Sequence, residues 1–438
     1  MSPSYATELY ERIHTALREI PTIDCHEHLQ RESELPEGDQ VHIGRFFVHY
    51  ANCDLVSAGM PGKDMARVQD DLRLTPRERW ALLAPWYRKA WNTAYCESLR
   101  IAIRSLYDIE DFDETTVDAL TDAMRAQIRP GFTRRVFDQA GIDFAMNNPF
   151  GPKLTYNPDF DTRCFIIDMV DGGFTRLAIS QLAAEFDTEV LCLDDYLHMI
   201  DKAFERHAAA ASAFKVGRAY DRTLFWEDVP HSRAEAVFNR LMAFNDQPDR
   251  KDVQAVEDYI LHYLCRKCGE HGLRMKFHTG LQEGNGNLVT HSRAALMANL
   301  FMKYPRTGFD IYHLSYPYQD ELVTLAKNFP NVTVDFCWMW IINPAAGRRA
   351  LSEMLDAVPA NKIHGFGGDY IFVEGSYGHA VIARREIARV LAEKVEEGRF
   401  SESYALEVGR MLLRDNALAN FGLPARRRAY KSLFGKSI

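Results

Sequence analysis

Short apolar runs and longer stretches of helical periodicity alternate along most of this chain. Runs of this kind, bounded by turn residues, are typical of buried strands. The eight predicted strands are 21–28, 142–146, 164–169, 212–216, 273–278, 309–313, 332–337 and 362–369. An apolar position at every third or fourth residue predicts helices between them. The predicted helices are 5–19, 194–210, 232–246, 251–271, 292–303, 318–329, 346–357, 378–397 and 402–413.

This alternation decides the fold class. Strands that alternate with helices imply a parallel sheet, and eight such units can close into a barrel. The chain is therefore predicted to be an α/β protein, a (β/α)8 TIM-type barrel. An open doubly wound sheet is the competing arrangement, but no glycine-rich phosphate loop follows an early strand, which disfavours a nucleotide-binding fold of that type.

Residues 30–135 do not follow this alternation of strands and helices. They are rich in aromatic residues, and the pair Thr75-Pro76 is a plausible helix start, with threonine as cap and proline in the first turn. A segment of this length is far longer than an ordinary connection. We predict one domain of residues 1–438, with a large helical insertion after the first strand at about 30–135 that lies over the catalytic end of the barrel.

Composition narrows the class of protein. The 438 residues are 47% hydrophobic and 26% charged, which is ordinary for a globular protein. The net charge of -9 and the pI near 5.9 argue against a nucleic-acid partner. We predict no membrane-spanning segment and no signal peptide, and the eight scattered cysteines suit reduced thiols. We therefore expect a cytoplasmic protein with no membrane partner.

Possible metal ligands stand at the ends of several predicted strands. Residues two apart in a strand point the same way, so His26 and His28 would project together and form half of a divalent metal site. His278, His313 and Asp369 end three further strands. Each could instead be a hydrogen-bonded or capping residue. In a barrel, however, the carboxyl ends of the strands converge, and imidazole with carboxylate suits Zn, Mn or Fe.

The segment after the fourth strand offers positive charge. Lys215 could carry a carbamate that bridges two metals, bind a substrate carboxylate as a cation, or reach solvent. Arg218 and Arg222 could pair bidentately with a carboxylate-bearing substrate or form surface salt bridges. Together with Tyr220 between the arginines, these residues are candidates for substrate binding.

Two further segments could line the pocket. Gln282 and Glu283 lie in the glycine-rich loop that follows His278 and offer polar groups above the barrel. Trp338, after the seventh strand, could form an apolar wall or belong to the core. His364 is interpreted as a structural or supporting histidine, because it lies within the last predicted strand.

The ordered set of motifs resembles the amidohydrolase superfamily, most closely the type fused to glutamine synthetase in fungal developmental and plant nodulin-like proteins. The motifs are His26-Glu27-His28, Lys276-Phe277-His278-Thr279-Gly280, Tyr312-His313-Leu314-Ser315-Tyr316-Pro317-Tyr318, Val334-Asp335-Phe336 and Gly367-Gly368-Asp369. The large insertion with Trp91-Asn92-Thr93-Ala94-Tyr95 is also similar to uronate isomerases of the same superfamily.

The resemblance implies a metal-dependent barrel and assigns roles to the strand-end residues. His26, His28, His278 and Asp369 would be the metal ligands, with one Zn2+ or Mn2+ per chain. His313 would orient or polarise the substrate, and Asp369 would also act as general base.

The function expected on these grounds is hydrolysis of an amide or related C–N bond by metal-activated water. The substrate would be small, polar and possibly carboxylated, for example a γ-glutamyl amide. A metal-dependent decarboxylase or other lyase, a uronate-type isomerase and a non-catalytic role are the alternatives. Barrels with exposed helices commonly assemble symmetrically, so we expect a homo-oligomer.

Overall fold

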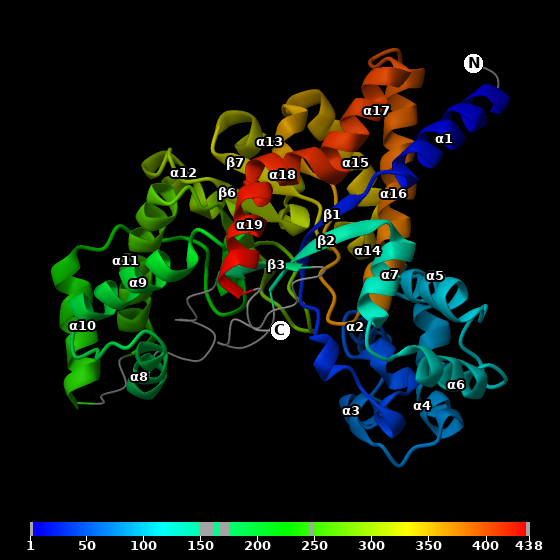
Figure 1. Cartoon of the computed structure of the whole chain (residues 1–438), viewed down its shortest axis with the longest axis horizontal. Helices are drawn as coiled ribbons and strands as arrows, with labels where there is room; N and C mark the ends of the chain where they lie inside the picture. Colours follow the sequence, from blue (N-terminus) through cyan, green and yellow to red (C-terminus); the bar gives the residue numbers. More distant parts are fainter. Residues whose placement is uncertain (1–2, 149–160, 166–174, 245–248, 435–438) are drawn as a thin grey trace.

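The barrel strands run in chain order around one sheet. The computed structural model describes residues 3–148, 161–165, 175–244 and 249–434 (Figure 1). The sheet is parallel throughout, in the order β1 to β8. The strands are β1 (Thr22–Glu27), β2 (Ile142–Asn147), β3 (Asp161–Phe165), β4 (Ala213–Val216), β5 (Met275–His278), β6 (Phe309–Tyr312), β7 (Val332–Asp335) and β8 (Ile363–His364).

Two strands differ from the sequence prediction. The prediction at 164–169 meets β3 only at residues 164–165, and residues 166–169 lie outside the described part of the chain. The last strand ends at His364 rather than at 369. The glycine-rich stretch that follows leaves the ladder with β7, and Asp369 has a φ of +60°, which no regular strand contains.

Residues 366–370 nevertheless close the barrel. The backbone N–H of Cys25 donates to the oxygen of Phe366 (3.1 Å), that of Asp369 to the oxygen of His26 (2.8 Å), and that of His28 to the oxygen of Tyr370 (3.0 Å). β1 is thereby bonded to β2 on one side and to the segment after β8 on the other. The predicted α/β class and (β/α)8 barrel are confirmed.

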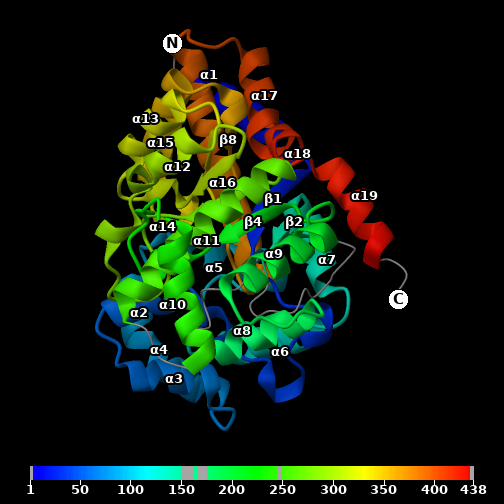
Figure 2. The same ribbon diagram turned by 90° about the vertical axis from the view of Figure 1, so that its left-hand side faces the viewer.

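Helices cover the outside of the barrel (Figures 1 and 2). They are α1 (Pro3–Arg18), α8 (Arg176–Glu185), α9 (Leu193–His207), α10 (His231–Phe244), α11 (Arg250–Glu270), α12 (Ala298–Lys303), α13 (Gln319–Asn328), α14 (Met339–Ile342), α15 (Pro344–Ala357), α16 (Val373–Glu396), α17 (Glu402–Arg410), α18 (Asn416–Asn420) and α19 (Leu423–Phe434). The helix predicted at 292–303 is helical as α12 only from residue 298, because short 3-10 turns precede it. No described helix has the length and apolar character of a membrane span.

The segment between β1 and β2 forms a helical layer at one end of the barrel (Figure 1). Its helices are α2 (Ala51–Ser57), α3 (Gly62–Asp70), α4 (Pro76–Ala90), α5 (Ala94–Tyr107), α6 (Val117–Gln127) and α7 (Phe132–Ala140). As predicted, Thr75 caps α4: its hydroxyl accepts from the N–H of Glu78, and Pro76 opens the helix.

A buried polar contact ties this layer to the barrel. Arg45 pairs with Glu374 at the start of α16 (3.3 Å), and the hydroxyl of Tyr107 donates to the same carboxylate (3.1 Å). Because the carboxylate of Glu374 is fully buried, its charge requires these partners.

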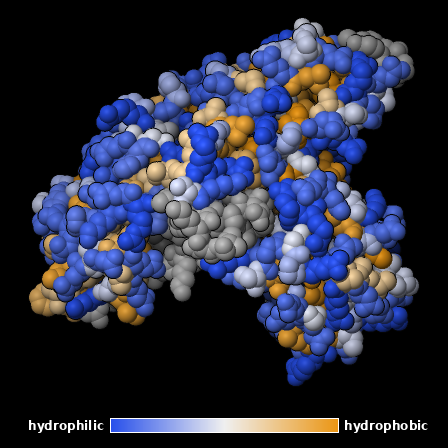
Figure 3. Space-filling view, in the orientation of Figure 1, coloured by the Kyte–Doolittle hydropathy of each residue, from blue (hydrophilic) through white to orange (hydrophobic). Residues whose placement is uncertain are grey.

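The surface of the molecule that faces the viewer in Figure 1 is mainly hydrophilic, and apolar groups show on it in separate patches (Figure 3).

The turn after β5 depends on a glycine. Gly280 has a φ of +74°, and a Cβ atom there would lie 2.3 Å from the backbone oxygen of Tyr316. The close approach is held by a hydrogen bond from the N–H of Leu281 to that same oxygen (2.7 Å). Gly398 is a useful comparison, because its φ is +71° but a Cβ atom there would have no neighbour within 4 Å.

We predict that Gly280→Ala destabilises the protein much more than Gly398→Ala. The left-handed backbone alone costs alanine about 1 kcal/mol, whereas at position 280 the backbone of 315–316 must also move. Urea unfolding midpoints of the two variants measure the difference. Equal midpoints would contradict the steric role of Gly280.

Candidate active site and metal centre

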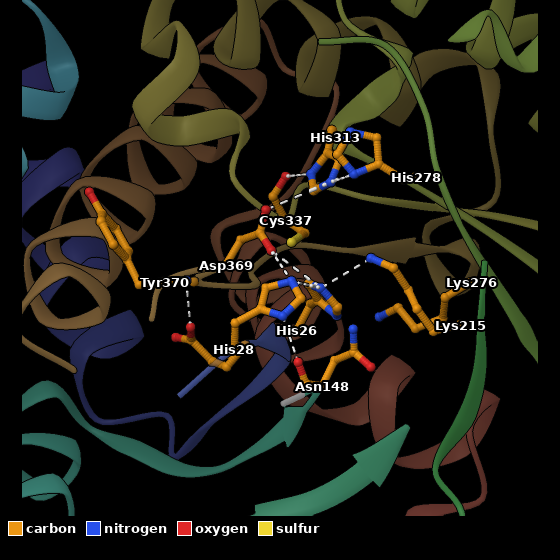
Figure 4. A network of polar contacts seen from close by, with 12 residues as sticks. His26, His28, Asn148, Lys215, Lys276, His278, His313, Cys337, Asp369 and Tyr370 are labelled. Atoms are coloured by element: carbon orange, nitrogen blue, oxygen red, sulfur yellow. Dashed lines mark hydrogen bonds and ion pairs between the residues drawn. The ribbon is translucent and has the colours of Figure 1, made fainter. Parts of the chain in front are cut away.

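His26 in β1 and His28 directly after it meet the carboxylate of Asp369 at the carboxyl end of the barrel (Figure 4). His26 and His28 share a face because strand side chains alternate, and their Nε2 atoms are 3.2 Å apart. Asp369 Oδ1 lies 3.2 Å from Nε2 of His26 and 3.4 Å from Nε2 of His28. In a tetrahedral zinc site with bonds of about 2.0–2.1 Å, neighbouring ligands are about 3.3–3.4 Å apart. The three atoms therefore have the spacing of ligands around one ion.

Backbone carbonyl groups fix the tautomers of three site histidines. A carbonyl oxygen only accepts, so each bonded ring nitrogen carries the proton and the opposite nitrogen carries a lone pair. The bonds run from Nδ1 of His28 to the oxygen of Asn148 (2.5 Å), from Nε2 of His278 to the oxygen of Leu281 (2.9 Å) and from Nδ1 of His313 to the oxygen of Cys337 (3.0 Å).

The free lone pairs then face one another. Nδ1 of His278 lies 3.1 Å from Nε2 of His313, and the latter lies 3.7 Å from Oδ2 of Asp369. His28 directs its Nε2 lone pair at His26 and Asp369. Acceptors that face acceptors in a buried site repel unless a cation or proton lies between them. This donor set therefore fits a divalent cation, and the carbonyl bonds are the supporting contacts that metal-binding histidines usually make.

Burial keeps the histidines neutral. Desolvation, together with the charge of Lys215, lowers the pKa of His26 and His28 well below its ordinary value and that of His278 to about 3. Burial raises the pKa of Asp369 to about 7, although Lys215 and Tyr50 oppose the shift. Asp369 is thus the group in this cluster that can gain or lose a proton near neutral pH.

Tyr50 is a site residue that the sequence did not reveal. Its hydroxyl lies 2.6 Å from Oδ2 of Asp369 and 2.6 Å from the backbone oxygen of the same residue. Its ring stacks on Trp338 at 4.5 Å, and the ring of His49 lies 3.9 Å away. The residue comes from the insertion, where no strand-end rule applies. The only available signal was the predicted position of the insertion over the site.

Strained backbone gathers at this site. Eight non-glycine residues in the described part of the chain have a positive φ. Six of them belong to the site or its turns: Tyr50, His313, Leu314, Ser315, Trp338 and Asp369. Such conformations cost free energy and persist where the surrounding structure imposes them, most often at functional sites. The distribution supports the assignment independently of the side-chain contacts.

Lys215 points into the site rather than to solvent. Its Nζ lies 3.3 Å from Nε2 of His26 and 4.2 Å from the centre of the Tyr312 ring. The residue is 9% exposed. Of the alternatives considered from the sequence, an amine that reaches solvent does not agree with this position.

Arg218 and Arg222 have protein carboxylates as partners. Nη2 of Arg218 donates to Glu257 (2.5 Å), and Arg222 donates to Glu257 (3.0 Å) and Asp258 (2.5 Å). Both carboxylates lie on α11, and all four side chains are buried. Substrate binding by these arginines stays a prediction, and it would require buried pairs to break at a cost of several kcal/mol.

The remaining predicted pocket residues lie around His278. The ring of Tyr220 is 4.8 Å from that of His278, and its hydroxyl accepts from the N–H of Glu283 (3.1 Å). Gln282 is buried and donates to the oxygen of Ala219 (3.1 Å), so it shapes the loop. Trp338 is also buried, and its ring stands edge-on to His313 at 5.2 Å.

A buried ionic layer lies beneath the site. Nζ of Lys276 donates to the backbone oxygen of Cys25 (2.6 Å) and lies 3.2 Å from Asp335 and 3.3 Å from Asp310. His364 bonds Asp310 (2.9 Å), which agrees with the supporting role expected for this histidine. The two carboxylates and His364 resemble a metal-binding group in spacing, but the ammonium of Lys276 already supplies the positive charge among them.

Comparison with known proteins identifies the family. The sequence model of the amidohydrolase family matches residues 200–423, just over half of the chain. The chain belongs to the amidohydrolase family. The resemblance inferred from the motifs is therefore confirmed, and the protein is a metal-dependent enzyme of the amidohydrolase superfamily.

Individual relatives of this amidohydrolase are distant. The FluG protein of Emericella nidulans is 27% identical over 144 residues, which are 33% of this chain but only 16% of that protein. Among solved structures, a uronate isomerase of Thermotoga maritima has a TM-score of 0.79 at 15% identity, over 94% of this chain and 97% of that one. A glucuronate isomerase of Caulobacter crescentus has a TM-score of 0.77 at 18% identity, over 97% and 95%.

A third solved structure carries a different description. A proposed metal-dependent hydrolase of Lactobacillus casei has a TM-score of 0.65 at 16% identity, over 94% of this chain and 97% of that one. At such identities, likeness establishes the shared fold and leaves the reaction open.

We predict that Zn2+ binding to this amidohydrolase displaces about one proton per ion from Asp369 at pH 6. Below its pKa of about 7, Asp369 holds a proton that the metal must displace. The neutral histidines hold no such proton, because their pKa values are lowered. Titration calorimetry of the metal-free protein with Zn2+, in buffers of different ionisation enthalpy, counts the protons.

The control for this prediction is Asp369→Asn. We expect this variant to bind Zn2+ more weakly and to release no proton from residue 369 at pH 6. Release of two or more protons at pH 6 would show that the histidines are protonated in the metal-free protein, contrary to this prediction.

Proposed function

We propose that the protein hydrolyses an amide or related C–N bond in a small carboxylated molecule. The observation that carries the proposal is the position of the Asp369 carboxylate, which touches His26, His28 and Tyr50 and can exchange a proton with a water beside them. A divalent ion held by His26, His28 and Asp369, with His278 as the further candidate ligand, would polarise the substrate carbonyl and favour ionisation of water.

Asp369 moves the proton in this reaction. Tyr50 donates to Oδ2 and leaves Oδ1 on the side of the histidines. Ionised Asp369 takes a proton from the attacking water and returns it to the leaving nitrogen, so that the residue ends the cycle as it began.

His313 accepts hydrogen bonds rather than donating them. Its Nδ1 proton is committed to the oxygen of Cys337, and burial lowers its pKa well below the ordinary value. In this form it can orient a water or a substrate N–H group but cannot donate to a developing oxyanion. The ammonium of Lys215 is the better donor for an anionic oxygen, since it lies beside His26 within the same pocket.

The proposed substrate class rests on the charge and the aromatic side chains of the site. Lys215 supplies a buried positive charge, and the stacked rings of Tyr50, Trp338 and Tyr95 supply apolar groups beside Asp369 and His313. A substrate with a carboxylate and a compact body, such as a γ-glutamyl amide, matches both features.

We predict that Asp369→Asn lowers kcat by about 10²–10⁴-fold, because the amide cannot accept the proton of the attacking water. Steady-state release of amine or ammonia from a panel of carboxylated amides, at saturating Zn2+, measures the effect. A variant with unchanged kcat and full metal content would remove Asp369 from the mechanism.

Isomerisation of a sugar acid is the second candidate. The observation that favours it is the direct contact between Tyr50 and Asp369, since aldose–ketose exchange moves one proton at carbon and another at oxygen. The fold likeness to uronate isomerases agrees with this alternative. Incorporation of solvent deuterium into a uronate, with no release of amine from any amide, would replace hydrolysis by isomerisation.

We predict that Tyr50→Phe shifts the rising limb of the kcat/KM pH profile upward by about one pH unit. The phenol donates to ionised Asp369, and a hydrogen bond to a charged group contributes about 1.5–3 kcal/mol, so its loss raises the pKa of the carboxyl. The pH profile of Tyr95→Phe is the control, because Tyr95 lies in the same stack and has no described bond to Asp369. Coincident profiles for wild type and Tyr50→Phe would contradict the contact.

A further inference from the structure

Two buried carboxyl groups lie on the same strand as His26. Asp24 and Glu27 both belong to β1, and neither is exposed to solvent. Glu27 is the residue between His26 and His28, so its side chain points to the opposite face of the strand from both histidines. The proposed reaction uses neither carboxyl group.

Both carboxyl groups bind the backbone that carries Asp369. Oδ1 of Asp24 accepts from the N–H groups of His26 (3.1 Å) and Gly368 (3.0 Å). Oε2 of Glu27 accepts from the N–H of Tyr370 (2.7 Å). The two N–H groups on either side of Asp369 are therefore each held by a side chain of the strand that carries the histidines.

A side chain at position 368 would collide with both carboxyl groups. A Cβ atom on Gly368 would lie 1.9 Å from Oε1 of Glu27 and 3.1 Å from Oδ2 of Asp24. The two side chains interact with each other, and Glu27 also interacts with the hydroxyl of Ser376. Together the two carboxyl groups fill the space that the missing side chain of Gly368 leaves.

Asp369 requires such a restraint. Its φ of +60° is unfavourable for a residue with a side chain, so the surrounding structure must impose it. Its own N–H is bonded to the oxygen of His26, which fixes one point of the loop. Asp24 and Glu27 hold the N–H groups of the residues before and after Asp369. Together, these three hydrogen bonds fix the direction of the Asp369 side chain.

We infer that Asp24 and Glu27 are positioning residues that fix the Asp369 carboxylate against His26 and His28 by holding the N–H groups of Gly368 and Tyr370. The kinetic consequence rests on the proposed function, whereas the structural consequence does not.

The experiment compares Glu27→Ala, Glu27→Gln and Glu386→Ala in the full chain. Glutamine retains an acceptor for Tyr370 and can donate to Asp24, so it is the rescue variant. Glu386 is a matched control, because it is equally buried, pairs with three arginines and lies further along α16 from the site. Three readouts are measured: hydrogen exchange of the backbone amides of 366–370, affinity of the metal-free protein for Zn2+ by chelator competition, and kcat against KM.

In Glu27→Ala we expect faster exchange at 366–370, Zn2+ affinity reduced about 10–100-fold, and a fall in kcat larger than any rise in KM. Glu27→Gln recovers most of the lost protection and affinity. Glu386→Ala lowers the melting temperature without these changes. Equal effects of Glu27→Ala and Glu386→Ala, or wild-type exchange and affinity in Glu27→Ala, would overturn the inference.

Two further outcomes are distinguishable. If Glu27→Ala does not fold, Glu27→Asp replaces it, because aspartate withdraws the carboxyl group from Tyr370 by one methylene. Glu27→Asp must then show the same changes in exchange, Zn2+ affinity and kcat, but smaller. If it does not, the inference is wrong. If the wild type binds no Zn2+ and turns over no amide, the proposed function fails, while the exchange data still decide the positioning role.

Discussion

The structure depends on the backbone hydrogen bonds between β1 and residues 366–370. These bonds close the barrel, and they join segments that are more than 340 residues apart in the chain. Their register also sets the chemistry, because a slip of one residue would turn His26 and His28 away from Asp369. A single pairing therefore determines both the closure of the barrel and the distances between Asp369 and the two histidines.

The pairing of β1 with residues 366–370 is not a regular strand ladder, and this irregularity sets the direction of the Asp369 side chain. A strand through residue 369 would place the Asp369 side chain by alternation alone. The chain instead leaves the sheet after His364, runs through three glycines and returns to β1 with Asp369 in the left-handed region. His313 and Trp338 adopt similar conformations after β6 and β7. Side chains at adjacent strand ends can thus converge on one point, at a free-energy cost that the buried contacts around them offset.

The sequence predicted what depends on periodicity. The barrel, the shared face of His26 and His28, and the convergence of His278, His313 and Asp369 follow from alternation and from the common direction of parallel strands. The sequence did not predict contacts between side chains from distant segments. Tyr50 reaches Asp369 from an insertion with no strand pattern, and Arg218 and Arg222 are matched by Glu257 and Asp258 on α11, which only the packing of that helix brings close. The eighth strand was predicted, but its early end at His364 was not, because glycine-rich segments form strands and turns alike.

The polar groups of the site divide into those with a fixed proton and one with a mobile proton. Carbonyl oxygens hold the protons of His28, His278 and His313 on the outward nitrogens, and burial prevents a second protonation. Lys276, deeper in the barrel, is held by Asp310 and Asp335. Asp369 alone combines a raised pKa with contacts to Tyr50 and to the imidazole lone pairs. Asp369 is therefore the proton carrier in the proposed hydrolysis and in the alternative isomerisation.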